Sequence, residues 1–323
     1  MSELSNKTLK SEISAKNGHS GQFRDIPLYY CYSWEAVPDK MIPNIFAEFK
    51  ANGADHLVFS YIWAERILRE PAFFPPLMTM AGKAGVKLGA IHAPWGAAFD
   101  LNCSDMARRQ GMVSDHKLMM AYAVEAGCKT YTMHVGAYSW VLEHVPLGRL
   151  RSLALDALEK LLPEAEKLGI VIAVENSYEP PNSAAEVAAL VKHFDSPHIG
   201  CCFDTGHACL MAPFPGKDPG KYFREIPDAW WQGLIECPDS FDIMKPYIKT
   251  VHMHDNDGYS DAHQLPGIGR IDWREQMKAL ESCPGLVSLQ TEVRTVPEAV
   301  PVRTLVETFQ GITENFKAAG MSI

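Results

Sequence analysis

Eight short apolar runs, spread over nearly the whole chain, restrict the fold more than any other feature of this sequence. Continuous apolar runs of this length are typical of strands that are buried on both faces of a parallel sheet. We therefore expect eight parallel strands. The runs are Pro27–Tyr32, His56–Tyr61, Lys87–Ala93, Thr130–Gly136, Val171–Ser177, Ile199–Thr205, Ile248–Asp255 and Val287–Val293.

The segments between these runs have apolar residues at helical spacing, and glycines follow two of them at Gly127 and Gly169, as at helix C-termini. Eight strand–helix units predict an α/β protein that forms a single (β/α)8 TIM barrel. A doubly wound open sheet is the competing fold, but the G-x-G-x-x-G turn that often accompanies it is absent. The clearest helical segments are Ser104–Ala126, Leu150–Leu168, Ala184–His193 and Pro301–Ala318.

The domain organisation follows from two segments that interrupt this alternation. Residues 1–25 are polar and lack an apolar core of signal-peptide length, so we expect a flexible N-terminal tail, with the barrel spanning residues 26–323. Residues 210–241 contain PFPGKDPG and two adjacent tryptophans, and are longer than an ordinary connection. We expect this loop to lie over the active-site face of the barrel.

Composition excludes several functional classes. The net charge of −9 argues against nucleic acid as a partner, because binding phosphates requires clustered basic residues. We find no apolar window long enough to span a membrane. The eight cysteines form no C-x-x-C pair and lie mostly in apolar segments, which predicts reduced thiols in a cytoplasmic protein.

Polar, ionisable residues stand at the ends of six consecutive apolar runs, where the chemistry of a barrel of this type is located. Each could be a hydrogen-bonded structural residue, but buried carboxylates and imidazoles without partners are costly. Sharing a cation would compensate all of them at once, so we expect a divalent metal site. Imidazole and carboxylate ligands without thiolate suit Mn²⁺, Co²⁺, Fe²⁺, Zn²⁺ or Mg²⁺. The residues are His92, His134, Glu175, Asp204, His207, His252, His254, Asp261, His263 and Glu292.

The motifs VEN, FDTGHA, HMHDNDG, DAHQLPGIGRIDW and TEV together resemble the xylose isomerase-like barrel superfamily. This superfamily includes sugar isomerases, sugar epimerases and the endonuclease IV family, and the resemblance covers nearly all of the chain after the tail. It implies a metal-dependent enzyme that acts on a small sugar or polyol. Barrels of this type are often dimers or tetramers, so the resemblance also allows a homo-oligomer.

In the ketose 3-epimerase branch, four residues hold one divalent metal, and two carboxylates move protons through an enediolate. By resemblance, the catalytic residues here are Glu175, Glu292 and His207, with His207 contacting the substrate. For the histidine ligand we favour His254 over His252 because of its spacing to Asp257. The implied metal ligands are Glu175, Asp204, His254 and Glu292.

Several residues just past strand ends are candidates for substrate binding. Trp95 and Tyr178 could pack against the apolar face of a sugar, and Arg294 could bind an acidic group. Trp230 or Trp231 could close over the sugar from the long loop, although packing at the barrel rim would explain these aromatics equally well.

Two alternative functions remain open. The endonuclease IV branch binds three zinc ions through nine ligands, and this sequence has a counterpart for each, with His92, His134, His207, Asp261 and His263 added to the four above. A multi-zinc phosphodiesterase is therefore the first alternative. A lyase or dehydratase acting on a keto-sugar or inositol-like substrate is the second, because the fold does not determine the reaction.

Overall fold

The computed structural model describes residues 26–296 and 298–319, and the predicted tail over residues 1–25 lies outside these residues. Its strands form one all-parallel sheet in the order β1-β8-β7-β6-β5-β4-β3-β2. A parallel bridge between Tyr30 and Leu57 connects the two ends of the sheet. The expected single (β/α)8 barrel is confirmed. The strands are β1 (Leu28–Tyr29), β2 (His56–Phe59), β3 (Lys87–His92), β4 (Thr130–His134), β5 (Val171–Glu175), β6 (Ile199–Asp204), β7 (Ile248–Met253) and β8 (Ser288–Thr291).

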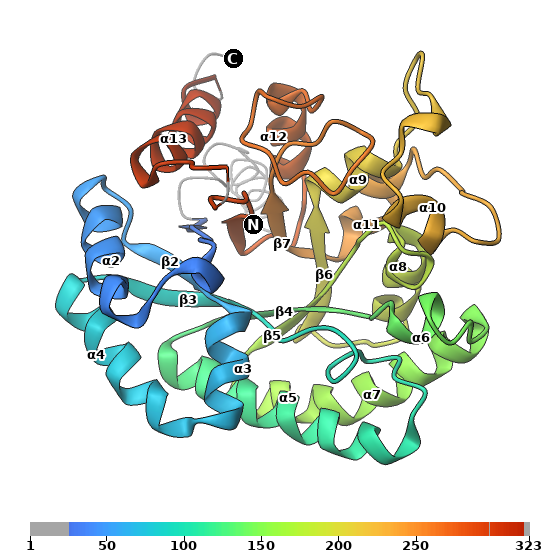
Figure 1. The fold of residues 1–323 in the computed structure, drawn as a ribbon, viewed down its shortest axis with the longest axis horizontal. Helices are drawn as coiled ribbons and strands as arrows, with labels where there is room; N and C mark the ends of the chain where they lie inside the picture. Colours follow the sequence, from blue (N-terminus) through green and yellow to red (C-terminus); the bar gives the residue numbers. More distant parts are fainter. Residues whose placement is uncertain (1–25, 297, 320–323) are drawn as a thin grey trace, which may run out of the picture.

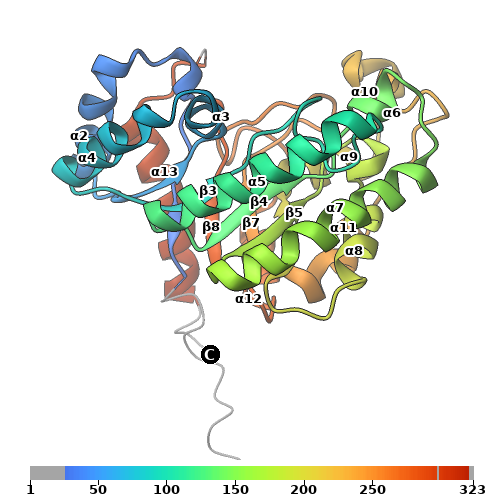
Figure 2. The same cartoon turned by 90° about the horizontal axis from the view of Figure 1, so that it is seen from below.

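Helices surround the strands on the outside of the barrel (Figure 1). The two longest central helices, α5 and α7, run side by side (Figure 2), and both end at a glycine with positive φ, Gly127 and Gly169, as predicted. The helices are α2 (Ile42–Ala51), α3 (Tyr61–Arg69), α4 (Phe74–Ala84), α5 (Met106–Ala126), α6 (Tyr138–Val141), α7 (Leu147–Leu168), α8 (Ala184–Lys192), α9 (Thr205–Met211), α10 (Glu225–Ala229), α11 (Ser240–Met244), α12 (Trp273–Glu281) and α13 (Val302–Ala319).

The two faces of each strand have different chemistry. Residues on one face, such as Ile91, Tyr131 and Val174, join the large apolar core shared with the helices. The alternate residues are small or polar and equally buried, as at Thr132, Ala173 and Cys202. Hydrogen bonds satisfy part of this inner layer: the Gln290 amide donates to Thr250, whose hydroxyl lies 2.7 Å from that of Ser288. The inner face of the barrel is therefore made of small and polar residues, and it continues into the polar residues at the strand ends.

The connection from β6 to β7 contains α9, α10 and α11, and it occupies the edge of the molecule near α6 and α8 (Figure 1). Lys217 anchors it, because its buried ammonium group donates to the carbonyls of Leu210 and Ala212 and pairs with Glu236 at 3.2 Å. All eight cysteines are free thiols. Among the described helices, none is both long and apolar enough to cross a bilayer.

Candidate metal centre and substrate cavity

The polar strand-end residues converge at the C-terminal end of the barrel. His134 lies opposite Glu175 in the pairing of β4 with β5, and Asp204 lies opposite His252 in the pairing of β6 with β7. Glu292 follows β8 directly. Because parallel strands in register bring their ends to one edge, residues far apart in sequence become neighbours here.

Four of these residues form a compact set, which we call the four-ligand group: Glu175, Asp204, His252 and Glu292. One potential ligand atom from each lies within 4.8 Å of the others. His252 Nδ1 is 2.8 Å from Glu175 Oε1 and 2.8 Å from Glu292 Oε2. Imidazole nitrogen and carboxylate oxygens at this spacing are suitable ligands for one divalent cation.

Two carboxylate oxygens in this group lack a hydrogen bond within the described part of the chain. Glu175 Oε2 and Glu292 Oε2 are buried and accept no hydrogen bond of acceptable geometry from the described residues. Imidazole nitrogens do lie near both oxygens: His252 Nδ1 is 2.8 Å from Glu292 Oε2, and His134 Nε2 and His92 Nε2 are 3.2 Å and 3.6 Å from Glu175 Oε2. A buried carboxylate oxygen without a hydrogen bond is unfavourable, so the residues present fit a bound cation.

The charges in the centre keep both glutamates ionised. Burial alone raises the pKa of Glu175, but the positive charges of His252 and His134 outweigh burial and hold this pKa well below its usual value. Burial also raises the pKa of Glu292, but the charge and the hydrogen bond of His252, together with the charge of His263, outweigh burial and lower this pKa. Burial lowers the pKa of His92, which favours the neutral imidazole that can bind a metal.

His254 belongs to a different set, which we call the second histidine group: His207, His254 and His263. His254 Nε2 lies 3.0 Å from both carboxylate oxygens of Asp204, and its ring stacks on His263 with centroids 3.9 Å apart. Asp261 pairs with His207 at 3.1 Å and with His263 at 3.0 Å. Burial lowers the pKa of His263, but the Asp261 carboxylate raises it to about 9.

The structure thus places His252, rather than the favoured His254, beside the two glutamates. Strand β7 ends at Met253, so the alternation that would direct both histidines to one side does not extend to His254. Instead, the Thr205 hydroxyl accepts a hydrogen bond from His254 N and donates one to its carbonyl. These contacts hold His254 against the end of β6.

A single buried carboxylate organises the loop between β7 and α12, which carries Asp261 and His263. Asp255 is 0% exposed and accepts four hydrogen bonds. The donors lie in both HMHDNDG and PGIGRIDW, so this carboxylate connects the two segments. A side chain at Gly269 would lie 2.4 Å from Asp255 Oδ1, so only glycine fits there. The donors to Asp255 are the backbone N–H groups of Asn256, Gly267 and Ile271, and Trp273 Nε1.

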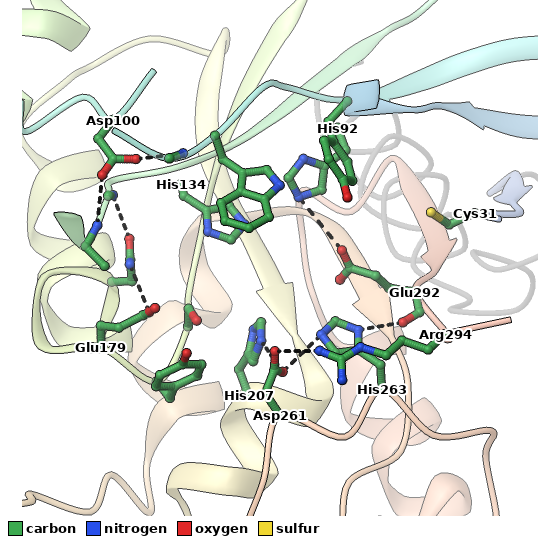
Figure 3. A pocket seen from close by; sticks show the side chains of 18 of the residues that line it. Cys31, His92, Asp100, His134, Glu179, His207, Asp261, His263, Glu292 and Arg294 are labelled. Carbon is green, nitrogen blue, oxygen red and sulfur yellow. Dashed lines mark hydrogen bonds and ion pairs between the residues drawn. The ribbon is translucent and has the colours of Figure 1, made fainter. Parts of the chain in front are cut away.

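A cavity of about 450 Å³ opens above this centre (Figure 3). The predicted residues His92, His134, His207, Asp261, His263 and Glu292 line it, as do Trp95, Tyr178 and Arg294. Glu175, Asp204, His252 and His254 lie outside the lining, and each is at most 2% exposed. Arg294 donates to Asp261 across 3.3 Å.

The cavity also contains residues that sequence reasoning missed. Tyr61 begins α3, two residues after the end of β2, and its position at the end of an apolar run was an available signal. Glu35 and Tyr138 follow β1 and β4 by several residues, where the sequence gives no marker of the barrel mouth. Glu179 is held by Asn182, whose amide donates to Glu179 Oε2 at 3.1 Å.

Trp230 and Trp231 do not line the cavity, so of the two interpretations left open for them the contacts favour packing at the barrel rim. Trp230 Nε1 donates to the Tyr178 carbonyl at 2.6 Å, so this indole stands behind the wall residue Tyr178. Trp231 packs on Trp140 with ring centroids 5.2 Å apart. No residue of 210–241 lines the cavity, because the connection packs against the outside of its wall.

Comparison with known proteins identifies the family and the fold. Residues 77–311 match the family described as xylose isomerase-like TIM barrel. An uncharacterised protein of Methanocaldococcus jannaschii is 25% identical over 72% of this chain and 73% of its own.

Among solved structures, a D-tagatose 3-epimerase-like protein superposes with a TM-score of 0.68 at 18% identity, covering 90% of this chain and 99% of its own. The IolI protein with a bound zinc atom gives a TM-score of 0.63 at 17% identity, covering 91% of this chain and 100% of its own.

Proposed function

Because the chain belongs to the xylose isomerase-like TIM barrel family, we propose that it is a divalent-metal-dependent isomerase or epimerase of a sugar or polyol. The observation that carries this proposal is the four-ligand group, with its two buried carboxylate oxygens that lack hydrogen bonds, beneath a cavity lined by ionisable residues. The epimerase-like and zinc-bound structures that share the fold support it.

Glu175, Asp204, His252 and Glu292 are the residues that would hold the metal, with His252 in the place first given to His254. A bound divalent cation would polarise the sugar carbonyl and an adjacent hydroxyl, and so stabilise the negative charge that develops when a neighbouring C–H bond loses its proton.

The glutamates are the proposed proton carriers. Glu292 lines the cavity, so its carboxylate can take a proton from a bound sugar. Glu175 lies beneath the cavity lining, but its Oε2 is near His92 and His134, which line the cavity. From that side, Glu175 would return a proton to the opposite face of the sugar. His207 is oriented by its hydrogen bonds to the Asn176 carbonyl and Asp261, and its proposed role is to contact the sugar oxygens.

Exchange of carbon-bound hydrogen with solvent tests this proposal directly. Metal-loaded protein is incubated in D₂O with a panel of ketoses, aldoses and polyols, and deuterium at carbon is measured by NMR. We expect exchange with at least one sugar, and we expect Glu292→Gln and Glu175→Gln to slow it by about 10²-fold or more, since each removes a proton carrier.

Glu159→Gln is the matched control, because this carboxylate is exposed on α7 and does not line the cavity. Its exchange rate is expected to equal that of the wild type. Near-normal exchange in either glutamate variant, with unchanged circular dichroism, contradicts the two-base scheme.

The second histidine group favours one other function, a multi-zinc phosphodiesterase. His207, His254 and His263 bring three imidazoles within ligand spacing of one another, next to Asp261. This function predicts two or three zinc ions per chain and cleavage of an abasic-site DNA or a simple phosphodiester. One metal per chain and no cleavage would reject it.

A further inference from the structure

The cavity is larger than one monosaccharide needs. Its volume is about 450 Å³. At about 30 Å³ per water molecule in the liquid, this space corresponds to about 15 waters. A hexose has only about 12 non-hydrogen atoms, and at the packing density of an organic solid it fills roughly 200 Å³. A sugar placed at the metal centre therefore leaves about half of the space free.

The two ends of the cavity differ in exposure. The inner end contains His92 and His207, which are 6% and 4% exposed, together with Glu292. The outer end contains Trp95 and Tyr138, which are 50% and 37% exposed. The free space beyond a sugar at the metal centre thus lies towards the exposed aromatics.

Both aromatics are held in place by well-defined contacts. The Trp95 ring lies nearly parallel to His134, at 16° with centroids 6.1 Å apart, and contacts Tyr61 on another side. Tyr138 begins α6, and its backbone N–H donates to the buried carboxylate of Asp100 at 3.1 Å. Half-exposed aromatic rings on a fixed backbone present apolar area at little loss of conformational entropy.

Two charged side chains of the cavity lining are exposed as well, and one of them, Arg294, pairs with Asp261 at 3.3 Å. Glu35 is exposed after β1, and Arg294 has a half-exposed side chain after β8. A purely apolar group would leave these charges desolvated, whereas the hydroxyl groups of a sugar can accept from the guanidinium and donate to the carboxylate. The combination matches a pyranose ring, which has an apolar face and polar edges.

We propose that the outer end of the cavity is a subsite for a second pyranose ring, so that the substrate is a ketose that carries a glycosyl group. This inference rests on the proposed function, because the reacting ketose occupies the metal centre. We define the outer subsite as Glu35, Trp95, Tyr138 and Arg294.

Matched sugars test the outer subsite. The affinities of metal-loaded protein for D-fructose and for its glucosylated forms turanose, maltulose and isomaltulose are measured by titration calorimetry. These disaccharides share the ketose and differ in linkage. We expect at least one to bind about tenfold or more tightly than D-fructose, because it adds a buried ring face.

Variants of the two cavity aromatics test whether they cause the tighter binding of the glucosylated ketose. Trp95→Ala and Tyr138→Ala are each expected to reduce the preference for the glucosylated ketose by about fivefold or more. Phe223→Ala is the control, because this aromatic is 58% exposed but does not line the cavity, and it should keep the wild-type preference. Equal or weaker binding of all three disaccharides relative to D-fructose overturns the subsite, as does a preference that survives both cavity variants.

The D₂O exchange assay separates this proposal from the proposed function. Exchange with free ketoses but no preference for glucosylated ones rejects the outer subsite alone. Tight binding of a glucosylated ketose that undergoes no exchange supports the subsite and rejects the isomerase or epimerase reaction.

Discussion

His252 and His254 are two residues apart, yet they face different carboxylates. His252 is inside β7 and reaches Glu175, whereas His254 follows the strand end and reaches Asp204. The sequence predicts that this segment delivers a histidine to a metal, but the choice between the two depends on where the strand stops. Past that end, the Thr205 hydroxyl, which is distant in sequence, hydrogen-bonds the backbone N–H and carbonyl of His254.

Single substitutions distinguish the two histidines. We expect His252→Ala to weaken Mn²⁺ binding to EDTA-treated protein by about 100-fold or more, because a direct ligand is lost. His254→Ala removes only a partner of Asp204, and we expect about a tenfold loss with one site per chain retained. Titration calorimetry measures both. A larger loss in His254→Ala than in His252→Ala would restore the assignment favoured from sequence.

His116 provides a pH-dependent test of the fold away from the metal centre. This α5 residue is 1% exposed, its Nε2 donates to the Phe99 carbonyl, and its Nδ1 accepts from the Tyr131 hydroxyl. Burial lowers its pKa from 6.5 to about 4. Between these pH values the unfolded chain binds the proton and the folded chain does not, so the free energy of unfolding falls as the pH drops from 6.5 to 4.

The size of this effect is about 3 kcal/mol across that interval, from about 1.4 kcal/mol per pKa unit. Urea unfolding at several pH values measures it. The glutamine in His116→Gln cannot titrate, so the free energy of unfolding of this variant should fall less over the same pH interval. At pH 7 the variant should be less stable than the wild type. An identical pH profile in wild type and variant would contradict the neutral, buried state of His116.

At the scale of elements, the apolar runs predicted all eight strands, because a doubly buried strand needs continuous apolar sequence. The contents of the cavity were harder to predict. Glu35 and Tyr138 lie several residues past their strands, and their position at the mouth depends on loop paths. The connection that carries Trp230 packs behind the wall, because its anchoring contacts, such as those of Lys217, form only in the fold.

The β7–α12 loop yields a prediction at this scale. Trp273→Phe keeps an aromatic ring but removes the donor to the buried Asp255 carboxylate. A hydrogen bond to a charged group contributes about 1.5–3 kcal/mol, so we expect a loss of that size in urea unfolding and faster proteolysis within the loop. Trp231→Phe, at a 43% exposed indole, is the control and should change stability by less than about 0.5 kcal/mol. Equal stability of the two variants would show that Asp255 does not depend on Trp273.

At the scale of the whole molecule, the eight similar strand–helix units close into a barrel, in which helices cover the outer face of the sheet and the other strands cover its inner face. Closure also brings six strand ends together, and it is this convergence that makes a set of separate histidines and carboxylates a metal centre. Sequence spacing showed which residues would converge but not how they divide into two groups.

A metal that binds only the folded barrel must stabilise it. We expect a free metal concentration of about 100 times Kd to raise the free energy of unfolding by about 2.7 kcal/mol relative to EDTA-treated protein. Thermal unfolding with and without Mn²⁺ measures this, and His252→Ala should lose most of the gain. Equal melting temperatures in metal and in EDTA would count against a metal within the barrel.

We propose that Glu175, Asp204, His252 and Glu292 hold one divalent cation at the base of the cavity. Elemental analysis of protein purified without added metal or chelator, alongside His252→Ala prepared identically, tests it most directly. We expect about one Mn, Co, Fe, Zn or Mg per wild-type chain and a large loss of metal in the variant. Wild-type protein that contains no divalent metal and takes none up, or a variant that retains the full wild-type content, would contradict it.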